Sequence, residues 1–137
     1  MAFVVAWLLL AATAAAKALT LPSKARVMRS EDPVIGLSVR SVMVLASAVE
    51  VVACAALLVL RDRCRRGVVL LGLGAQFLAY HGARLMIAPH GLCPCLGSAW
   101  KWLGLSEIGA TYLALGIAFH ILATGALLLA YARCDVK

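Results

Sequence analysis

Residues 34–60 read VIGLSVRSVMVLASAVEVVACAALLVL, and residues 61–66 continue as RDRCRR. The apolar stretch is longer than the roughly 20 residues that a helix needs to cross the hydrocarbon core of a bilayer. The basic stretch holds four arginines in six residues, and it is too short to have its own fold. An apolar run that stops at a dense basic cluster is typical of a transmembrane helix followed by a cytoplasmic loop.

Three further apolar runs cover residues 2–21, 67–88 and 106–132. The first contains Lys17 and ends at Pro22, but it has no basic residues before it and exceeds the apolar core of a signal peptide, so we expect it to be a membrane helix. The whole chain of 137 residues is 64% apolar and 14% charged, against roughly 45–50% and about 25% in soluble proteins. The sequence therefore predicts an all-α membrane protein, an antiparallel bundle of four transmembrane helices forming one domain over residues 1–137.

The arginine cluster also predicts the orientation of the bundle. Because positively charged loops stay in the cytoplasm, the N- and C-termini are expected inside and the connectors 23–33 and 89–105 outside. The basic residues lie at helix ends and in this cluster rather than along a soluble face, so the net charge of +7 does not indicate a nucleic-acid partner. The partner expected first is the lipid bilayer of a bacterial inner membrane, with the second outer connector facing the periplasm.

That outer connector contains the sequence HGLCPCLG at residues 90–97. Cys93 and Cys95 would close a very small ring, and a strained, exposed disulfide is easily reduced. Arg84, His90 and Lys101 lie near the pair and would favour the thiolate form that takes part in exchange. Thiol–disulfide exchange is the favoured interpretation, ahead of a disulfide that only braces the loop and ahead of a soft-metal site made with His90.

The other three cysteines indicate no chemistry. Cys54 lies inside an apolar run and is expected to be a small core residue. Cys64 and Cys134 stand beside basic residues at the predicted cytoplasmic side, where we expect them to be reduced.

Glu50 is the one acidic residue inside the second predicted span. An ionisable group at this depth is costly and normally faces the bundle interior with a partner. Gln76 and His120 fall at a similar depth in the third and fourth spans when about 1.5 Å is counted per residue. We therefore expect these three side chains, together with Tyr80 of the third span, to form one buried polar cluster.

Gln76, Tyr80 and Arg84 recur every four residues, which places them on one face of the third helix, with His81 adjacent. In a functional interpretation this stripe conducts protons or binds a quinone headgroup beneath the cysteines. In a structural interpretation it forms interhelical hydrogen bonds that hold the bundle in register. The structural interpretation is favoured, because a sequence does not show a cavity.

Four spans, Glu50 in the second and the motif Cys93-Pro94-Cys95-Leu96-Gly97 before the fourth resemble the MauE/DoxX-like family of redox-associated membrane proteins. The resemblance covers nearly the full length, and Leu96 replaces the phenylalanine of the family's Cys-x-Cys-Phe-Gly signature. The MauE branch is implicated in maturing a disulfide-rich periplasmic enzyme subunit alongside a thioredoxin-like partner, and the DoxX branch is linked to quinone-dependent respiratory chemistry. The resemblance implies thiol and electron traffic at the outer membrane face.

The sequence as a whole predicts a membrane thiol–disulfide exchange protein that supports the maturation of a periplasmic or membrane redox enzyme. Cys93 and Cys95 would react with a thioredoxin-like extracytoplasmic protein or a membrane redox complex, supported by Arg84, His90 and His81. One alternative is a non-catalytic structural or assembly subunit of such a complex. Another is a soft-metal transporter or metallochaperone. No metal site is assigned, and a quinone is the one candidate cofactor.

Overall fold

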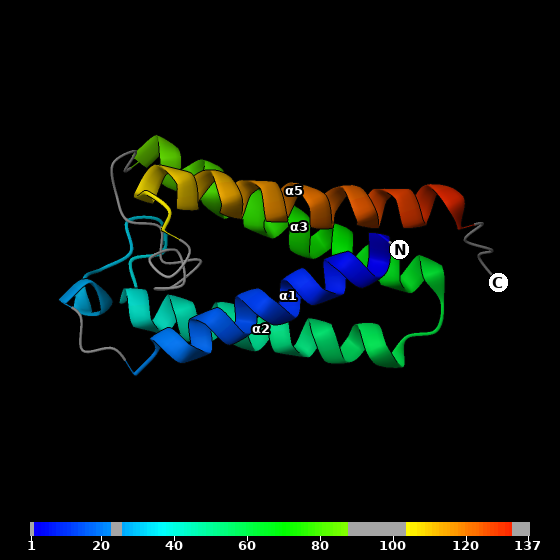
Figure 1. Cartoon of the computed structure of the whole chain (residues 1–137), viewed down its shortest axis with the longest axis horizontal. Helices are drawn as coiled ribbons and strands as arrows, with labels where there is room; N and C mark the ends of the chain where they lie inside the picture. Colours follow the sequence, from blue (N-terminus) through cyan, green and yellow to red (C-terminus); the bar gives the residue numbers. More distant parts are fainter. Residues whose placement is uncertain (1, 23–25, 88–103, 133–137) are drawn as a thin grey trace.

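The computed structural model describes residues 2–22, 26–87 and 104–132 (Figure 1). In these residues it is all-helical, and four helices are long and apolar enough to cross a membrane. The all-α class and the four spans predicted from the sequence are confirmed. The helices are α1 (Ala2–Thr20), α2 (Val39–Val59), α3 (Arg63–Ile87) and α5 (Glu107–Tyr131), with a short 3-10 helix η1 (Arg26–Arg29) between α1 and α2.

The bundle consists of two pairs of helices, and the two helices within each pair run antiparallel (Figure 1). Helix α1 packs on α2, and α3 packs on α5, whereas the contacts of α2 with α3 and of α1 with α5 are few. The connector between α2 and α3 lies at the same end as the start of α1 and the end of α5. The segment 26–38 lies at the other end, where α3 ends and α5 begins.

Helix α2 begins at Val39 rather than at residue 34 as predicted. The preceding residues form a turn in which the Asp32 carboxylate accepts hydrogen bonds from the backbone N–H groups of Val34 (3.0 Å) and Ile35 (3.2 Å). Gly36 closes the turn at φ 72°, in the left-handed region that glycine adopts without a steric penalty. The apolar residues 34–37 are therefore used in a turn, and Ser38 caps the helix through its Oγ.

Helix α3 begins at Arg63, earlier than the predicted residue 67. The carboxylate of Asp62 accepts hydrogen bonds from the backbone N–H groups of Cys64 (3.1 Å) and Arg65 (3.3 Å). These donors have no partner within a helix, and an aspartate before the first turn satisfies them. Three of the four clustered arginines thus belong to the first turn of α3 instead of to a loop.

Glycines let α3 and α5 come into backbone contact. A Cβ atom on Gly125 would lie 2.4 Å from the backbone nitrogen of Leu71, and one on Gly74 would lie 2.6 Å from the Cα atom of Leu122. Small residues permit this approach in membrane bundles, where burial alone does not favour a helix over lipid. Gly72 of the same helix has open space around it, so it does not take part in this contact.

Candidate functional site

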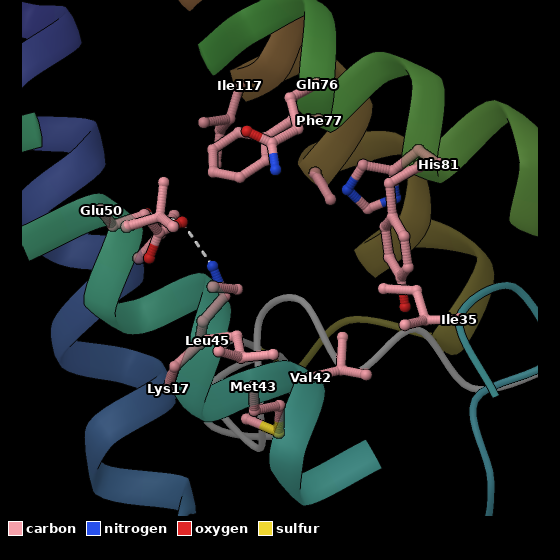
Figure 2. Close-up of a pocket in the computed structure, with 15 residues that line it drawn as sticks. Lys17, Ile35, Val42, Met43, Leu45, Glu50, Gln76, Phe77, His81 and Ile117 are labelled. Carbon is pink, nitrogen blue, oxygen red and sulfur yellow. Dashed lines mark hydrogen bonds and ion pairs between the residues drawn. The ribbon is translucent and has the colours of Figure 1, made fainter. Parts of the chain in front are cut away.

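A cavity of about 230 Å³ lies between the two helix pairs, in the half of the bundle nearer the segment 26–38 (Figure 2). All four long helices contribute to its wall, together with Ile35. Most of its lining is apolar, and its polar members come from three helices: Thr13 and Lys17 of α1, Glu50 of α2, and Gln76, Tyr80 and His81 of α3.

The deepest polar feature of the cavity is a buried ion pair between Lys17 and Glu50, whose side chains meet across α1 and α2 (Figure 2). The residues are 4% and 1% exposed. The Lys17 ammonium donates to Glu50 Oε1, and the Thr13 hydroxyl donates to the same oxygen at 3.3 Å. The ammonium also lies 5.4 Å from the centroid of the Phe77 ring, within the range of a cation–π interaction.

The second carboxylate oxygen of this pair has a different environment. Glu50 Oε2 is buried and has no hydrogen-bond partner among the residues that the structure describes. Buried polar atoms are nearly always hydrogen-bonded, so this oxygen has an accepting capacity that the described residues leave unused.

The structure places the predicted polar cluster differently from the expectation. Glu50, Gln76 and Tyr80 do line one cavity, but the hydrogen bonds of Glu50 go to Lys17 and Thr13. His120 is outside the cavity lining, and its Nε2 is buried without a hydrogen-bond partner in the described part of the chain.

Sequence reasoning noted Lys17 but missed it as the partner of Glu50. The signal was present, since Lys17 is the one charge inside the first apolar run and Glu50 the one acid inside the second. Opposite charges in adjacent antiparallel spans can meet only if both helices turn them inward, and the sequence did not settle that rotation.

A second buried carboxylate, Asp32, fastens the segment 26–38 to α3. It is 0% exposed, and its Oδ2 accepts from the Tyr80 hydroxyl at 2.6 Å and from Arg84 Nη1 at 2.8 Å. Its other oxygen accepts from two backbone N–H groups of its own turn. We call the group Asp32, Tyr80 and Arg84 the rim latch.

Opposing effects act on the pKa of Asp32. Burial raises it, while the hydrogen bonds from Tyr80, Val34 and Ile35 and the charge of Arg84 lower it. The stabilising contacts prevail, so the pKa of Asp32 lies below the ordinary aspartate value. The rim latch therefore contains an ionised carboxylate at neutral pH.

The stripe on α3 has partners that the sequence did not reveal. Tyr80 and Arg84 both reach Asp32, which agrees with their shared helix face. His81 is buried, lines the cavity and packs edge-to-face on Tyr80 with ring centroids 5.7 Å apart. The signal for Asp32 was weak, because its carboxylate lies in a connector and reaches α3 only through the folding of the turn.

Cys93, Cys95 and His90 lie outside the described residues, so their predicted site has no described geometry. Cys54 is a free, partly buried thiol. Cys64 is disulfide-bonded with a partner outside the described residues, so the prediction of a reduced thiol at this position is wrong. No group of three His, Cys, Asp or Glu side chains in residues 2–22, 26–87 and 104–132 could hold a metal ion.

Comparison of the chain with models of protein families, with curated proteins and with solved structures found no match. The described structure defines a class rather than a family: a four-helix bundle able to span a membrane, with an internal cavity that contains a buried ion pair. The resemblance to the MauE/DoxX-like family stays a prediction.

Proposed function

We propose that this chain is a membrane thiol–disulfide exchange protein that uses Cys93 and Cys95. The observation that carries the proposal is the Cys-Pro-Cys motif in the connector between α3 and α5. Both ends of this connector leave the end of the bundle at which the rim latch joins the segment 26–38 to α3. The described residues next to the connector, Ile87 and Gly104, thus lie at a bundle end that buried polar contacts hold together.

The exchange moves two electrons between two cysteine pairs. When Cys93 and Cys95 are reduced, the thiolate of one attacks a disulfide of the partner and forms a mixed disulfide, while one partner sulfur leaves as a thiolate. The other cysteine of the pair then attacks the mixed disulfide, closes the Cys93–Cys95 bond and releases the partner in its dithiol form. An oxidised Cys93–Cys95 pair runs the same steps in reverse with a reduced, thioredoxin-like partner.

The rim latch changes the role that the sequence suggested for Arg84. Its guanidinium is 2.8 Å from Asp32, so most of its charge is balanced inside the rim latch and little is left to favour a distant thiolate. We assign Arg84 to holding the end of α3, and His90 is the basic residue nearest the pair in sequence.

The proposed orientation places the arginine-rich start of α3 in the cytoplasm and the cysteine motif in the periplasm of a bacterial inner membrane. Four arginines at residues 61–66 support it. The disulfide of Cys64 opposes it, because disulfides rarely persist in the cytoplasm. An impermeant thiol reagent applied to intact cells after mild reduction decides between the two: the proposed orientation requires labelling at Cys93 and Cys95 and none at Cys64.

The exchange reaction is tested by trapping in vivo. Cys93→Ser and Cys95→Ser are expressed separately, and non-reducing gels with mass spectrometry should find a mixed disulfide with a thioredoxin-like protein through the remaining cysteine. Cys54→Ser is the matched control, since this thiol is free but lies within α2. Absence of any adduct in both single variants contradicts the proposal. A variant with serine at both Cys93 and Cys95 is then examined. If it still assembles into a larger redox complex, the chain is a structural subunit.

A further inference from the structure

We infer that a second pocket of the bundle binds the headgroup of an anionic phospholipid from the adjacent membrane leaflet. This pocket has a volume of about 360 Å³ and is lined by the first turns of α1 and α3 and the last two turns of α5. We call it the end pocket, because it lies at the end of the bundle opposite the rim latch (Figure 1). No cysteine and no member of the rim latch lines it in the described structure, so the inference does not depend on the proposed thiol exchange.

Two of the four arginines in residues 61–66 are used within the protein. The guanidinium carbon of Arg66 lies 4.6 Å from the centroid of the Phe3 ring, and its Nε donates to a backbone carbonyl. The guanidinium of Arg65 lies 3.8 Å from the carboxylate of Asp62. That carboxylate also accepts from two backbone N–H groups at the start of α3. An anion in the end pocket therefore has to be bound by the remaining arginines rather than by these groups.

The other two arginines carry charge that the described residues do not balance. Arg61 and Arg63 are exposed and take part in none of the ion pairs in the described part of the chain. Arg63 lines the end pocket, and a guanidinium offers a fork of N–H donors that binds phosphate in a bidentate manner. Basic pockets between transmembrane helices are typical sites for anionic lipid headgroups. The charge at this pocket therefore selects a phosphate group that brings a net negative charge.

The lining of the end pocket changes from polar to apolar along α5, as a phospholipid does from headgroup to acyl chain. Tyr131, in the last turn of α5, supplies a hydroxyl at the helix end, where aromatic residues commonly meet the membrane surface. Leu127 and Leu128 line the pocket one turn deeper, and Leu127 is 51% exposed. Thr124 lies one turn further in and is buried, and its hydroxyl can donate to an ester carbonyl. The phosphate therefore belongs beside Arg63 and Tyr131, with the ester groups deeper.

The apolar part of the wall favours a lipid over a soluble phosphate compound. Phe3, Leu127 and Leu128 line the end pocket together with Arg63, and they offer no favourable burial to a ligand that is hydrophilic throughout. The volume of about 360 Å³ is near the lower limit of pockets that enclose a whole small molecule, roughly 300–1,000 Å³. It therefore suits a phosphoglycerol headgroup, while the acyl chains leave over the exposed Leu127 and lie in the bilayer.

The selectivity for an anionic lipid is tested with the full-length protein in a mild nonionic detergent. The probes are dioleoylphosphatidylglycerol, dioleoylphosphatidylcholine with the same acyl chains, and glycerol phosphate, and native mass spectrometry measures the bound fraction during titration. We expect phosphatidylglycerol to bind at least about tenfold more tightly than phosphatidylcholine, because only its headgroup brings a net negative charge to Arg63. Equal affinities for the two lipids overturn the inference. Glycerol phosphate that binds as tightly as phosphatidylglycerol overturns the lipid as the ligand.

The role of Arg63 is tested against a matched arginine of the same helix turn. Arg63→Gln should weaken the binding of phosphatidylglycerol at least about tenfold. Arg65→Gln removes the same charge at an exposed residue that does not line the end pocket, and it should weaken binding about twofold or less. Equal losses in the two variants overturn the end pocket as the site, because they indicate only a general attraction of the basic helix end to anionic lipid.

The path of the acyl chain is tested with two exposed leucines. Leu127→Trp fills the apolar side of the end pocket and should weaken the binding of phosphatidylglycerol at least about fivefold. Leu58→Trp places the same side chain on α2, at a residue that is 64% exposed and does not line the pocket, and should leave binding unchanged. Equal effects of the two tryptophans overturn the proposed placement, also if Arg63→Gln fails to fold.

Discussion

The bundle contains two buried carboxylates, Asp32 at the rim and Glu50 in the cavity, and each is paired with a basic side chain from another element. Both oxygens of Asp32 accept hydrogen bonds, from two side chains and two backbone groups. Lys17 and Thr13 both donate to Oε1 of Glu50, and Oε2 has no partner in the described part of the chain.

This difference separates the two ion pairs by how completely the described residues satisfy the buried carboxylate. Desolvation of a charge is offset only when its remaining hydrogen-bonding capacity is also used. Asp32 meets that condition inside the protein, so its pair can be explained by the turn that it holds. Glu50 leaves one buried oxygen without a partner in the described part of the chain, so the desolvation of its charge is offset less completely.

The largest expected effect is the loss of the cation in the cavity. Lys17→Met leaves Glu50 buried without its partner, which should destabilise the bundle by about 3–5 kcal/mol. The measurement is unfolding in mixed detergent micelles. Arg65→Met is the control, since its ion pair with Asp62 is exposed and should contribute less than about 1 kcal/mol. If Lys17→Met and Arg65→Met lowered the stability equally, the buried ion pair in the cavity would contribute no more than the exposed pair at the surface.

A smaller loss is expected at the rim. Asp32→Asn keeps the size of the side chain but weakens the contacts with Tyr80 and Arg84, which should cost about 1.5–3 kcal/mol. The same unfolding measurement applies, together with faster proteolysis in the segment 26–38. Glu31→Gln changes an exposed neighbour and should have little effect. If Asp32→Asn is neutral, the rim latch does not hold the turn.

Acid should weaken the rim latch through the titration of Asp32. Its pKa is lowered in the folded protein, so its contribution to stability is fully present above the ordinary value of about 3.9. That contribution is lost as the pH falls through the lower pKa of the folded state. The difference in stability between the native chain and Asp32→Asn should therefore shrink below about pH 4. A constant difference from pH 6 to pH 3 would contradict an ionised rim latch.

The smallest effect on stability is expected when both members of the cavity pair are replaced. Lys17→Met combined with Glu50→Leu removes the desolvation cost together with the attraction and should change stability by less than about 1 kcal/mol. A double variant that is as unstable as Lys17→Met alone would show that the pair makes a net contribution to stability.

The sequence predicted the number and class of the helices because long apolar runs have few stable structures in a bilayer. It placed the start of α2 five residues too early, since Val34 and Ile35 are apolar but follow an aspartate and a proline that form a turn. The pairing of Lys17 with Glu50 required the rotation of two helices, and the pairing of Asp32 with Arg84 required a connector to fold back on α3. Neither is encoded in local periodicity.

The backbone contact of α3 with α5 at Gly74 and Gly125 has a mechanical consequence for the cysteine connector. Two helices in such contact move as one body, so the points at which the connector departs from Ile87 and returns at Gly104 keep a constant spacing.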